Sequence, residues 1–145
     1  MTTGAAAAAA QAKAALDNAK AEIAKAYGTL MTGYSKADWK VTSQIYGPNC
    51  TILAPGRPGL KGKEAAENYW KQLKEETGVS KIEIKAEELN GSGSWFFERG
   101  AYKLYRGEKG AEKAFEERKY IKIWRKWEGK LLIYTYIYNV VPVAQ

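Results

Sequence analysis

The sequence predicts an α+β domain in which three helices pack into the concave face of a cone-shaped, curved antiparallel sheet. In the N-terminal half, apolar residues recur every three or four positions, which is the spacing of an amphipathic helix. From Ile82 onward apolar and polar residues alternate, which is typical of strands. Several of these strands are long enough that accumulated twist should bend them. The chain has 145 residues, the length of one ordinary domain, so we expect residues 1–145 to form a single unit.

Two helices are predicted before the first strand. The first covers residues 5–32, with residues 1–11 as a frayed tip, and Gly33 is placed to end it. A short second helix follows Ser35, which stands three positions before Asp38, the spacing of a capping box. Asp38 therefore has a structural role in this interpretation.

A third helix is predicted from Lys63 to Thr77, with Gly78 as its cap. Gly100 lies inside a long strand, where a glycine often marks a bend, so we expect the sheet to curve there. The predicted strands are residues 50–54, 82–87, 94–105, 115–127 and 131–141.

Composition narrows the functional classes. The chain carries a net charge of +7, no histidine and one cysteine, Cys50. Basic residues of the later strands alternate with apolar ones, as on a sheet with one wet face, so nucleic-acid binding is not expected. The lone cysteine is typical of a reducing, cytoplasmic setting. No apolar run reaches the roughly 18 residues of a membrane span, and we expect neither a metal nor a cofactor.

Four short sequence segments occur in a characteristic order: Leu60–Ala65, Phe97–Tyr102, Lys119–Lys126 and Tyr136–Asn139. Together with the order of elements, over residues 12–142, they resemble the nuclear transport factor 2-like superfamily, in particular its SnoaL-like branch, a cystatin-like α+β roll. The resemblance implies a conical pocket between sheet and helices. It also implies a homodimer formed through the outer face of the sheet.

The resemblance implies proton-transfer chemistry as one possible activity. In SnoaL-like relatives an acidic residue commonly precedes the closing asparagine by three positions, and here that position is Tyr136. Glu98 shares a strand face with Tyr102 by alternation. Glu98 could therefore act as a catalytic base, with Tyr102 or Tyr136 donating a hydrogen bond to an oxyanion. The same pattern also fits a structural glutamate paired with an arginine or a tyrosine hydroxyl.

The last strand brings aromatic residues together. By alternation Tyr134, Tyr136 and Tyr138 share one face, which suits a cavity needing apolar area and scattered hydroxyl groups. Equally, the tyrosines could pack on the helices and fill the cone. The predicted pocket residues are Trp39, Tyr46, Tyr69, Trp70, Glu98, Tyr102, Tyr134, Tyr136, Tyr138 and Asn139.

Three functions follow from these observations. The first is binding of a small, largely apolar or aromatic organic molecule in an aromatic-lined pocket. The second is an isomerase, cyclase or dehydratase with Glu98 as base. The third is a dimeric interaction or scaffold protein. Because fold does not determine function, the residues of the site must decide between them.

Overall fold

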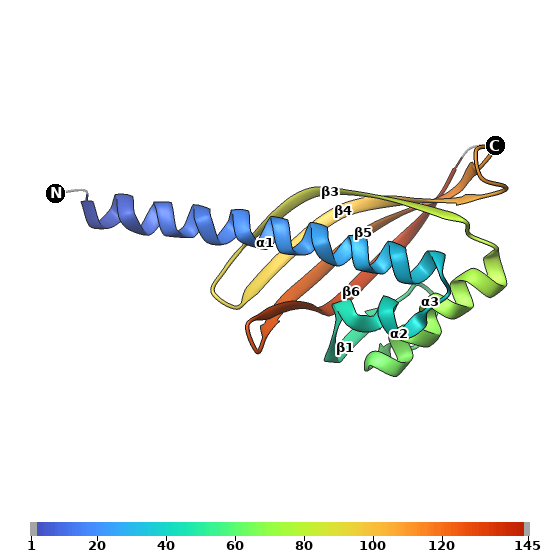
Figure 1. Cartoon of the computed structure of the whole chain (residues 1–145), viewed down its shortest axis with the longest axis horizontal. Helices are drawn as coiled ribbons and strands as arrows, with labels where there is room; N and C mark the ends of the chain where they lie inside the picture. Colours follow the sequence, from blue (N-terminus) through green and yellow to red (C-terminus); the bar gives the residue numbers. More distant parts are fainter. Residues whose placement is uncertain (1–2, 144–145) are drawn as a thin grey trace.

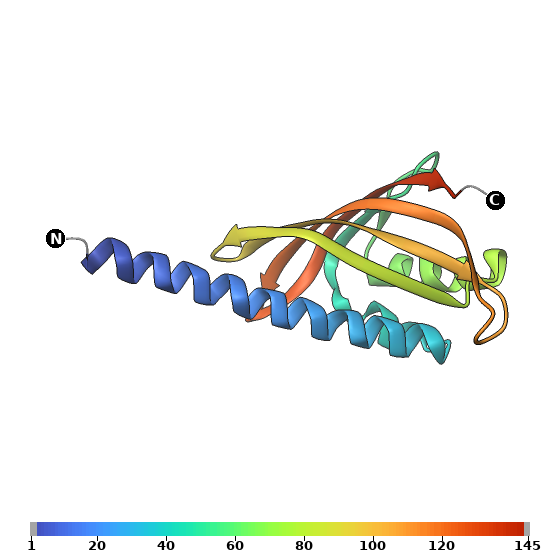
Figure 2. The same ribbon diagram turned by 90° about the horizontal axis from the view of Figure 1, so that it is seen from above.

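A long helix lies along one face of a curved sheet, with two shorter helices beside its C-terminal end, in the computed structural model of residues 3–143 (Figure 1, Figure 2). The N-terminal part of this helix projects past the sheet, and residues 4–15 are exposed. The elements are α1 (Thr3–Ser35), α2 (Trp39–Thr42), the 3-10 turn η1 (Ser43–Ile45), β1 (Tyr46–Leu53), β2 (Leu60–Lys61), α3 (Lys63–Thr77), β3 (Lys81–Ser92), β4 (Trp95–Arg106), β5 (Lys113–Trp127) and β6 (Lys130–Pro142).

The sheet has six strands in the order β2-β1-β6-β5-β4-β3. The four long strands form the predicted antiparallel part, and the predicted α+β class is confirmed. The exception to the predicted antiparallel pairing is β1, which pairs parallel to β6 and makes the sheet mixed. Between β1 and β3 the chain forms β2 and α3. The long strand beside β1 is β6, which is the last strand of the chain.

The boundaries of the first two helices differ from the prediction. The segment 3–11, expected to fray, lies within α1, and Met1 and Thr2 lie outside the described residues. The second helix is only one turn long, because β1 begins already at Tyr46. Asp38 has the predicted structural role, but as the N-cap itself: its side chain accepts a hydrogen bond from the Val41 amide (3.2 Å).

Gly33 was predicted to end α1, but the helix continues past it. The role of Gly33 is to let α2 pack closely against α1. The helix continues to Ser35 and the chain turns at Ala37, which has a positive φ of 53°. A Cβ atom on Gly33 would lie 2.5 Å from the Thr42 Oγ1 atom and 2.6 Å from the Thr42 amide nitrogen. A side chain at position 33 would therefore push the two helices apart.

The strands bend where Gly100 was predicted to bend them. Glu87 is an extra residue in β3, since Ala86 pairs with Gly100 and Glu88 with Arg99. A Cβ atom on Gly100 would lie 2.4 Å from the Lys85 carbonyl oxygen and would also overlap the Tyr120 ring. Glycine thus makes room on both sides of β4 at the bulge.

A second bulge changes which way the last strand's tyrosines point. Ile123 pairs with Thr135 and Trp124 with Ile133, so Tyr134 is an extra residue in β6. Tyr136 is buried, whereas Tyr134 faces outward against Trp95, with ring centroids 5.2 Å apart. Strict alternation was therefore the wrong rule for Tyr134.

The two faces of β5 are the reverse of what its sequence suggested. The expected wet face carries Arg118 and Lys122, yet both side chains are buried inside the cone. Ile121, expected on the dry side, is 45% exposed on the outer face. The interior of this protein therefore contains charge, and its outer sheet surface contains apolar side chains.

We expect opposite effects from two glycine substitutions in α1. Gly33→Ala should lower the free energy of unfolding by about 1–3 kcal/mol through overpacking against Thr42. Gly28→Ala, where a Cβ atom would meet nothing within 4 Å, should raise it by about 0.5–1 kcal/mol through helix propensity. Urea unfolding of both variants measures the difference, and equal effects would contradict the close packing of α1 on α2.

Candidate functional site

Glu98 lies at the centre of a buried polar cluster on the concave face of β4. Its side chain is 1% exposed. The Tyr27 hydroxyl donates to both carboxylate oxygens (2.7 and 2.8 Å), and the Trp124 indole nitrogen donates to Oε1 (2.9 Å). The Tyr120 hydroxyl donates to Oε2. Three donors thus satisfy a carboxylate that would be very costly to bury alone.

The backbone places these donors by simple rules. Glu98 and Gly100 point inward by alternation in β4, and Tyr120 of β5 is paired directly with Gly100. Because Gly100 has no side chain, the Tyr120 ring can lie over it and reach Glu98. Tyr27 comes from α1, so its hydrogen bonds also hold that helix on the sheet.

The side chain of Lys122 is hydrogen-bonded to the Glu98 cluster. Its side chain is 2% exposed, and Nζ donates to the Tyr27 hydroxyl (2.8 Å). Nζ also lies over the rings of Tyr27, Tyr120 and Tyr136, at 4.4, 4.6 and 5.0 Å from their centroids. Tyr27 therefore connects a buried ammonium group to a buried carboxylate.

Burial sets the protonation of these groups. It lowers the pKa of Lys122 to about 8, although the negative charge of Glu98 opposes this shift. Burial raises the pKa of Tyr27 well above its ordinary value, and the nearby Glu98 charge raises it further. The phenol consequently remains a hydrogen-bond donor at neutral pH.

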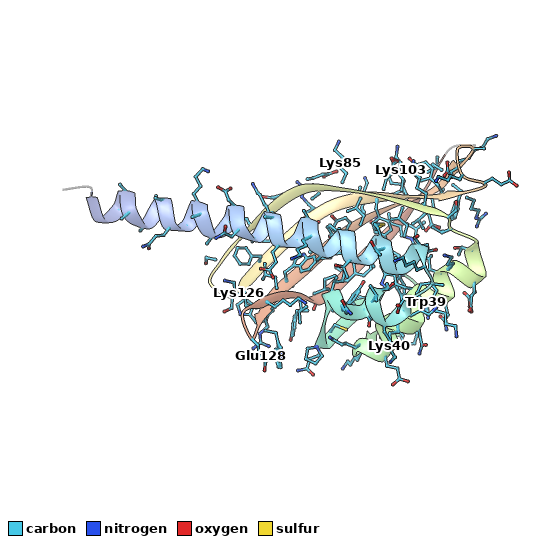
Figure 3. The ribbon with its side chains drawn as sticks, viewed as in Figure 1. Trp39, Lys40, Lys85, Lys103, Lys126 and Glu128 are labelled. Carbon is cyan, nitrogen blue, oxygen red and sulfur yellow. The ribbon has the colours of Figure 1, made fainter. Side chains whose placement is uncertain are left out.

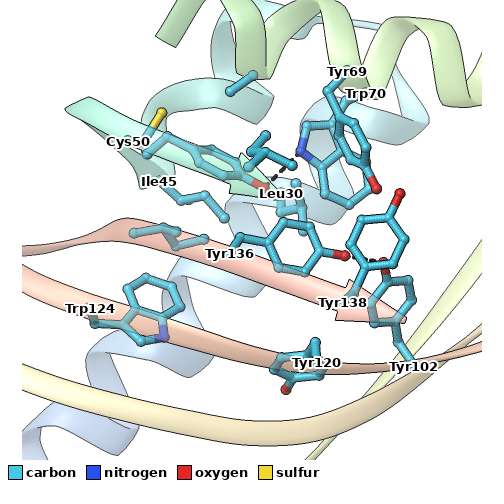
Figure 4. Packing of buried hydrophobic residues seen from close by; sticks show 14 of the residues in the cluster. Leu30, Ile45, Cys50, Tyr69, Trp70, Tyr102, Tyr120, Trp124, Tyr136 and Tyr138 are labelled. Atoms are coloured by element: carbon cyan, nitrogen blue, oxygen red, sulfur yellow. Dashed lines mark hydrogen bonds between the residues drawn. The ribbon is translucent and has the colours of Figure 1, made fainter. Parts of the chain in front are cut away.

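A second polar cluster surrounds Arg118, and Figure 4 shows the tyrosines packed there. One guanidinium nitrogen donates to the hydroxyls of Tyr69 (2.8 Å) and Tyr102 (3.3 Å). The Tyr102 and Tyr136 hydroxyls are hydrogen-bonded to each other. The predicted catalytic residues Tyr102 and Tyr136 thus belong to the Arg118 cluster and are not hydrogen-bonded to Glu98.

Aromatic rings fill most of the cone. Tyr69 packs edge-on against Trp70 (5.1 Å between centroids) and Tyr136 stacks on Tyr138 (5.2 Å). The Trp70 indole nitrogen donates to the Tyr46 hydroxyl (2.9 Å). Of the two possibilities raised by the sequence, a lined cavity or a filled core, these tyrosines form a filled core.

A pocket remains beside this core, between α1 and β3. It has a volume of about 340 Å³. Ile23, Ile84 and Leu89 are among its apolar walls, and Tyr27 and Glu98 lie at its inner end. Its remaining lining residues are Lys20, Ala24, Ala86, Glu87 and Glu88.

The structure distributes the predicted pocket residues over several environments. Trp39 is half-buried on the outside of the helices and packs on Tyr34 (Figure 3). Tyr134 and Asn139 are exposed on the outer face of the sheet and do not line the cone, which corrects their assignment. The inward-facing predicted residues are Tyr46, Tyr69, Trp70, Glu98, Tyr102, Tyr136 and Tyr138.

Sequence reasoning missed the partners of Glu98. None of Tyr27, Tyr120, Lys122 and Trp124 is among the site residues predicted from the sequence. A signal was present: a lysine between two aromatic residues on the same strand face, Tyr120 and Trp124, is unusual on a solvent-facing surface. To assign this face of β5 to the interior, one would need to know which face of the sheet the helices cover.

Two further features were looked for in residues 3–143, a cluster of metal-binding side chains and a helix able to span a membrane. No group of three or more histidine, cysteine, aspartate or glutamate side chains is arranged to hold a metal ion in this part of the chain. None of the helices described is both long and apolar enough to cross a membrane.

The lowered pKa of Lys122 predicts a rise in stability with pH. Between pH 8 and about 9.5 the unfolded chain, with an ordinary lysine pKa, binds a proton that folded Lys122 has lost, so the free energy of unfolding should rise by up to about 1.4 kcal/mol per pH unit. This contribution is absent below the folded pKa. Urea unfolding across this range should show the rise in the wild type and in Lys126→Met, an exposed control, but not in Lys122→Met. Equal slopes in the two variants would contradict it.

Comparison with known proteins identifies the fold. No protein-family model matches the sequence, and none of the curated proteins is significantly similar to it. Among solved structures, a ketosteroid isomerase-like protein from Erwinia carotovora is 20% identical, with a TM-score of 0.65, over 83% of this chain and 95% of that one. A Nostoc punctiforme protein of unknown function with a cystatin-like fold is 13% identical, with a TM-score of 0.69, over 85% and 91%. A variant of a protein named for NTF2 is 19% identical, with a TM-score of 0.65, over 85% and 99%. The chain therefore has the nuclear transport factor 2-like fold, as its sequence predicted.

Proposed function

We propose that the protein binds a small, largely apolar or aromatic organic molecule in the pocket between α1 and β3. The observation that carries this proposal is an apolar-walled space of about 340 Å³ that borders the buried Glu98 cluster. Pockets of this size and lining are typical of small-molecule sites. The location differs from the predicted one, because the tyrosines of β6 occupy the centre of the cone.

The polar groups at the inner end of the pocket favour an apolar ligand. The Tyr27 hydroxyl already donates to Glu98 and accepts from Lys122. Both Glu98 oxygens accept hydrogen bonds from protein side chains. A ligand gains little by presenting a polar group there, because it would have to displace an existing partner. Its affinity would come mainly from contact with Ile23, Ile84 and Leu89.

The alternative of a proton-transfer enzyme has weaker support. Glu98 is at the pocket as required, but a base must reach the proton of its substrate directly or through one water. Tyr27, Tyr120 and Trp124 occupy the acceptor positions of its carboxylate. Turnover would require one of these donors to leave. The geometry supports a binding role for the pocket better than a catalytic one.

Replacing either of two alanines of α1 with tryptophan tests whether the pocket binds the ligand. Ala24 lines it, whereas Ala21 is equally exposed on the same helix and does not. Ala24→Trp should block binding of the neutral fluorescent probe N-phenyl-1-naphthylamine, because the indole fills the space, while Ala21→Trp should bind it as the wild type does. Fluorescence titration measures the affinity. Wild-type affinity in Ala24→Trp, or no saturable binding to the wild type, would contradict the proposal.

We also propose that two copies associate through the outer face of the sheet. Part of this face is apolar: Ile121 and Ile137 are paired across β5 and β6 and are each 45% exposed. Exposed apolar surface is often found at interfaces. The other large exposed apolar side chains of the described strands are Leu53, Trp95, Phe97, Trp127, Tyr134 and Val140.

The double substitution Ile121→Lys and Ile137→Lys should convert a dimer into a monomer, since two lysines would be desolvated on each side of the interface. Analytical ultracentrifugation measures the mass. Ala21→Lys, which adds charge to an exposed position of α1, is the control and should leave the dimer intact. A monomeric wild type would contradict this proposal and would leave the pocket proposal unaffected.

A further inference from the structure

The three side chains that donate to Glu98 are two tyrosines and a tryptophan, the side chains that lose one electron most readily apart from cysteine. Tyr120 and Tyr27 donate through O–H groups and Trp124 through its N–H group. We propose that Tyr120 and Glu98 form a redox site, in which a one-electron oxidant converts Tyr120 into a buried neutral tyrosyl radical and Glu98 takes the proton.

The chemistry of phenols explains why the carboxylate matters. A phenol that loses an electron becomes so strongly acidic that it must release its proton, and in a dry interior a base has to be in place. Tyr120 is 2% exposed and already donates its hydroxyl proton to Glu98 Oε2. A preorganised acceptor removes the cost of rearranging the surroundings when the electron leaves.

A continuous chain of aromatic rings connects Tyr120 to the surface. It begins at Trp39, which is half-buried and stands beside the exposed Lys40 (Figure 3). Each ring packs against the next, with centroids between 5.1 and 6.5 Å apart. The steps run from Trp39 to Tyr34, Trp70, Tyr69, Tyr136 and Tyr120. Short steps of this kind let an electron move from Tyr120 to an oxidant at the surface without that oxidant entering the core.

The other tyrosines in the chain are less favourable sites for the radical. The Tyr34 hydroxyl donates to a backbone carbonyl, that of Val79, which is a far weaker base than a carboxylate. Tyr69 accepts a hydrogen bond from Arg118, whose positive charge opposes loss of an electron. Tyr136 is bonded only to another phenol.

Tyr27 also donates to Glu98, but its oxygen accepts a hydrogen bond from Lys122 (2.8 Å). That contact withdraws electron density from the phenol oxygen and favours its reduced form. Lys122 Nζ lies over both rings, 4.4 and 4.6 Å from the centroids of Tyr27 and Tyr120, so its charge opposes the oxidation of both. What distinguishes the two phenols is the hydrogen bond, which Lys122 donates to the Tyr27 oxygen. Of the two phenols at the carboxylate, Tyr120 is therefore the one that oxidises more easily.

The oxidation of Tyr120 transfers one electron to the oxidant and one proton to Glu98. A one-electron oxidant such as a photogenerated ruthenium(III) polypyridyl complex accepts one electron and becomes ruthenium(II). The O–H bond of Tyr120 breaks, its proton forms a bond with Glu98 Oε2, and Tyr120 is left as a neutral radical. An electron returned from a reductant, with the proton moving back from Glu98, restores the starting state.

Flash photolysis with an anionic ruthenium polypyridyl complex tests the proposal, since the protein is basic and Lys40 beside Trp39 would attract such a complex. Optical absorption and electron paramagnetic resonance should detect a long-lived tyrosyl radical in the wild type. Its formation should slow in D₂O, because a proton moves with the electron.

Tyr105→Phe is the matched control for Tyr120→Phe. Tyr105 also donates its hydroxyl to a glutamate, Glu83, but it lies near the protein surface, where Glu83 is exposed to solvent. The long-lived radical should be lost in Tyr120→Phe and retained in Tyr105→Phe, and Trp39→Phe should slow its formation. Circular dichroism confirms that each variant is folded. A long-lived radical of unchanged yield in Tyr120→Phe, or a rate without an isotope effect, would overturn the proposal. An unchanged rate in Trp39→Phe would overturn the proposed electron path.

Discussion

The burial of one carboxylate constrains the rest of the structure. An ionised glutamate removed from water is tolerable only when its oxygens are hydrogen-bonded, and removing one partner of a buried charged group typically costs roughly 3–5 kcal/mol, a large part of the usual stability of a domain. Glu98 meets this requirement with Tyr27 of α1 and with Tyr120 and Trp124 of β5. The long helix and two neighbouring strands are thereby joined at one point. Gly100 belongs to the same constraint, because any larger residue would displace Tyr120.

The inverted faces of β5 follow from the same requirement. Once Glu98 is inside, a basic residue inside is less costly, and Lys122 reaches the Glu98 cluster through Tyr27. Arg118 is accommodated by an ion pair with Glu116 and by the hydroxyls of Tyr69 and Tyr102. Because the strand alternates, placing these cations inward places the isoleucines outward. The register of β5 therefore determines both the polar interior and the apolar outer surface that we propose as an interface.

This packing also limits what the cone can bind. In a hollow roll the concave face of the sheet would contact the ligand, but here five buried tyrosines cover it, at Tyr69, Tyr102, Tyr120, Tyr136 and Tyr138. The hydroxyls of Tyr69, Tyr102, Tyr120 and Tyr136 bond to one another and to buried charges rather than to a vacant space. The space that remains lies at the edge, where α1 crosses β3. In our proposals, the aromatic interior serves electron transfer and the edge pocket serves ligand binding.

Local chemistry in the sequence determined the class of fold, the third helix, the long strands and the position of the bend at Gly100. These depend on periodicity, caps and glycine, which act over a few residues. Alternation also placed Glu98 on one face with Tyr102, which holds along β4, whereas the concave position of that face came from the family resemblance. Only the tertiary structure decided the parallel pairing of β1 with β6, the outward turn of Tyr134 at a bulge, and the burial of Lys122. Each of these depends on which strand or helix lies alongside, a contact between residues far apart in the chain that no local pattern encodes. Tyr27 shows this most clearly: it meets Glu98 across 71 positions of sequence, and only the folded chain brings the phenol and the carboxylate together.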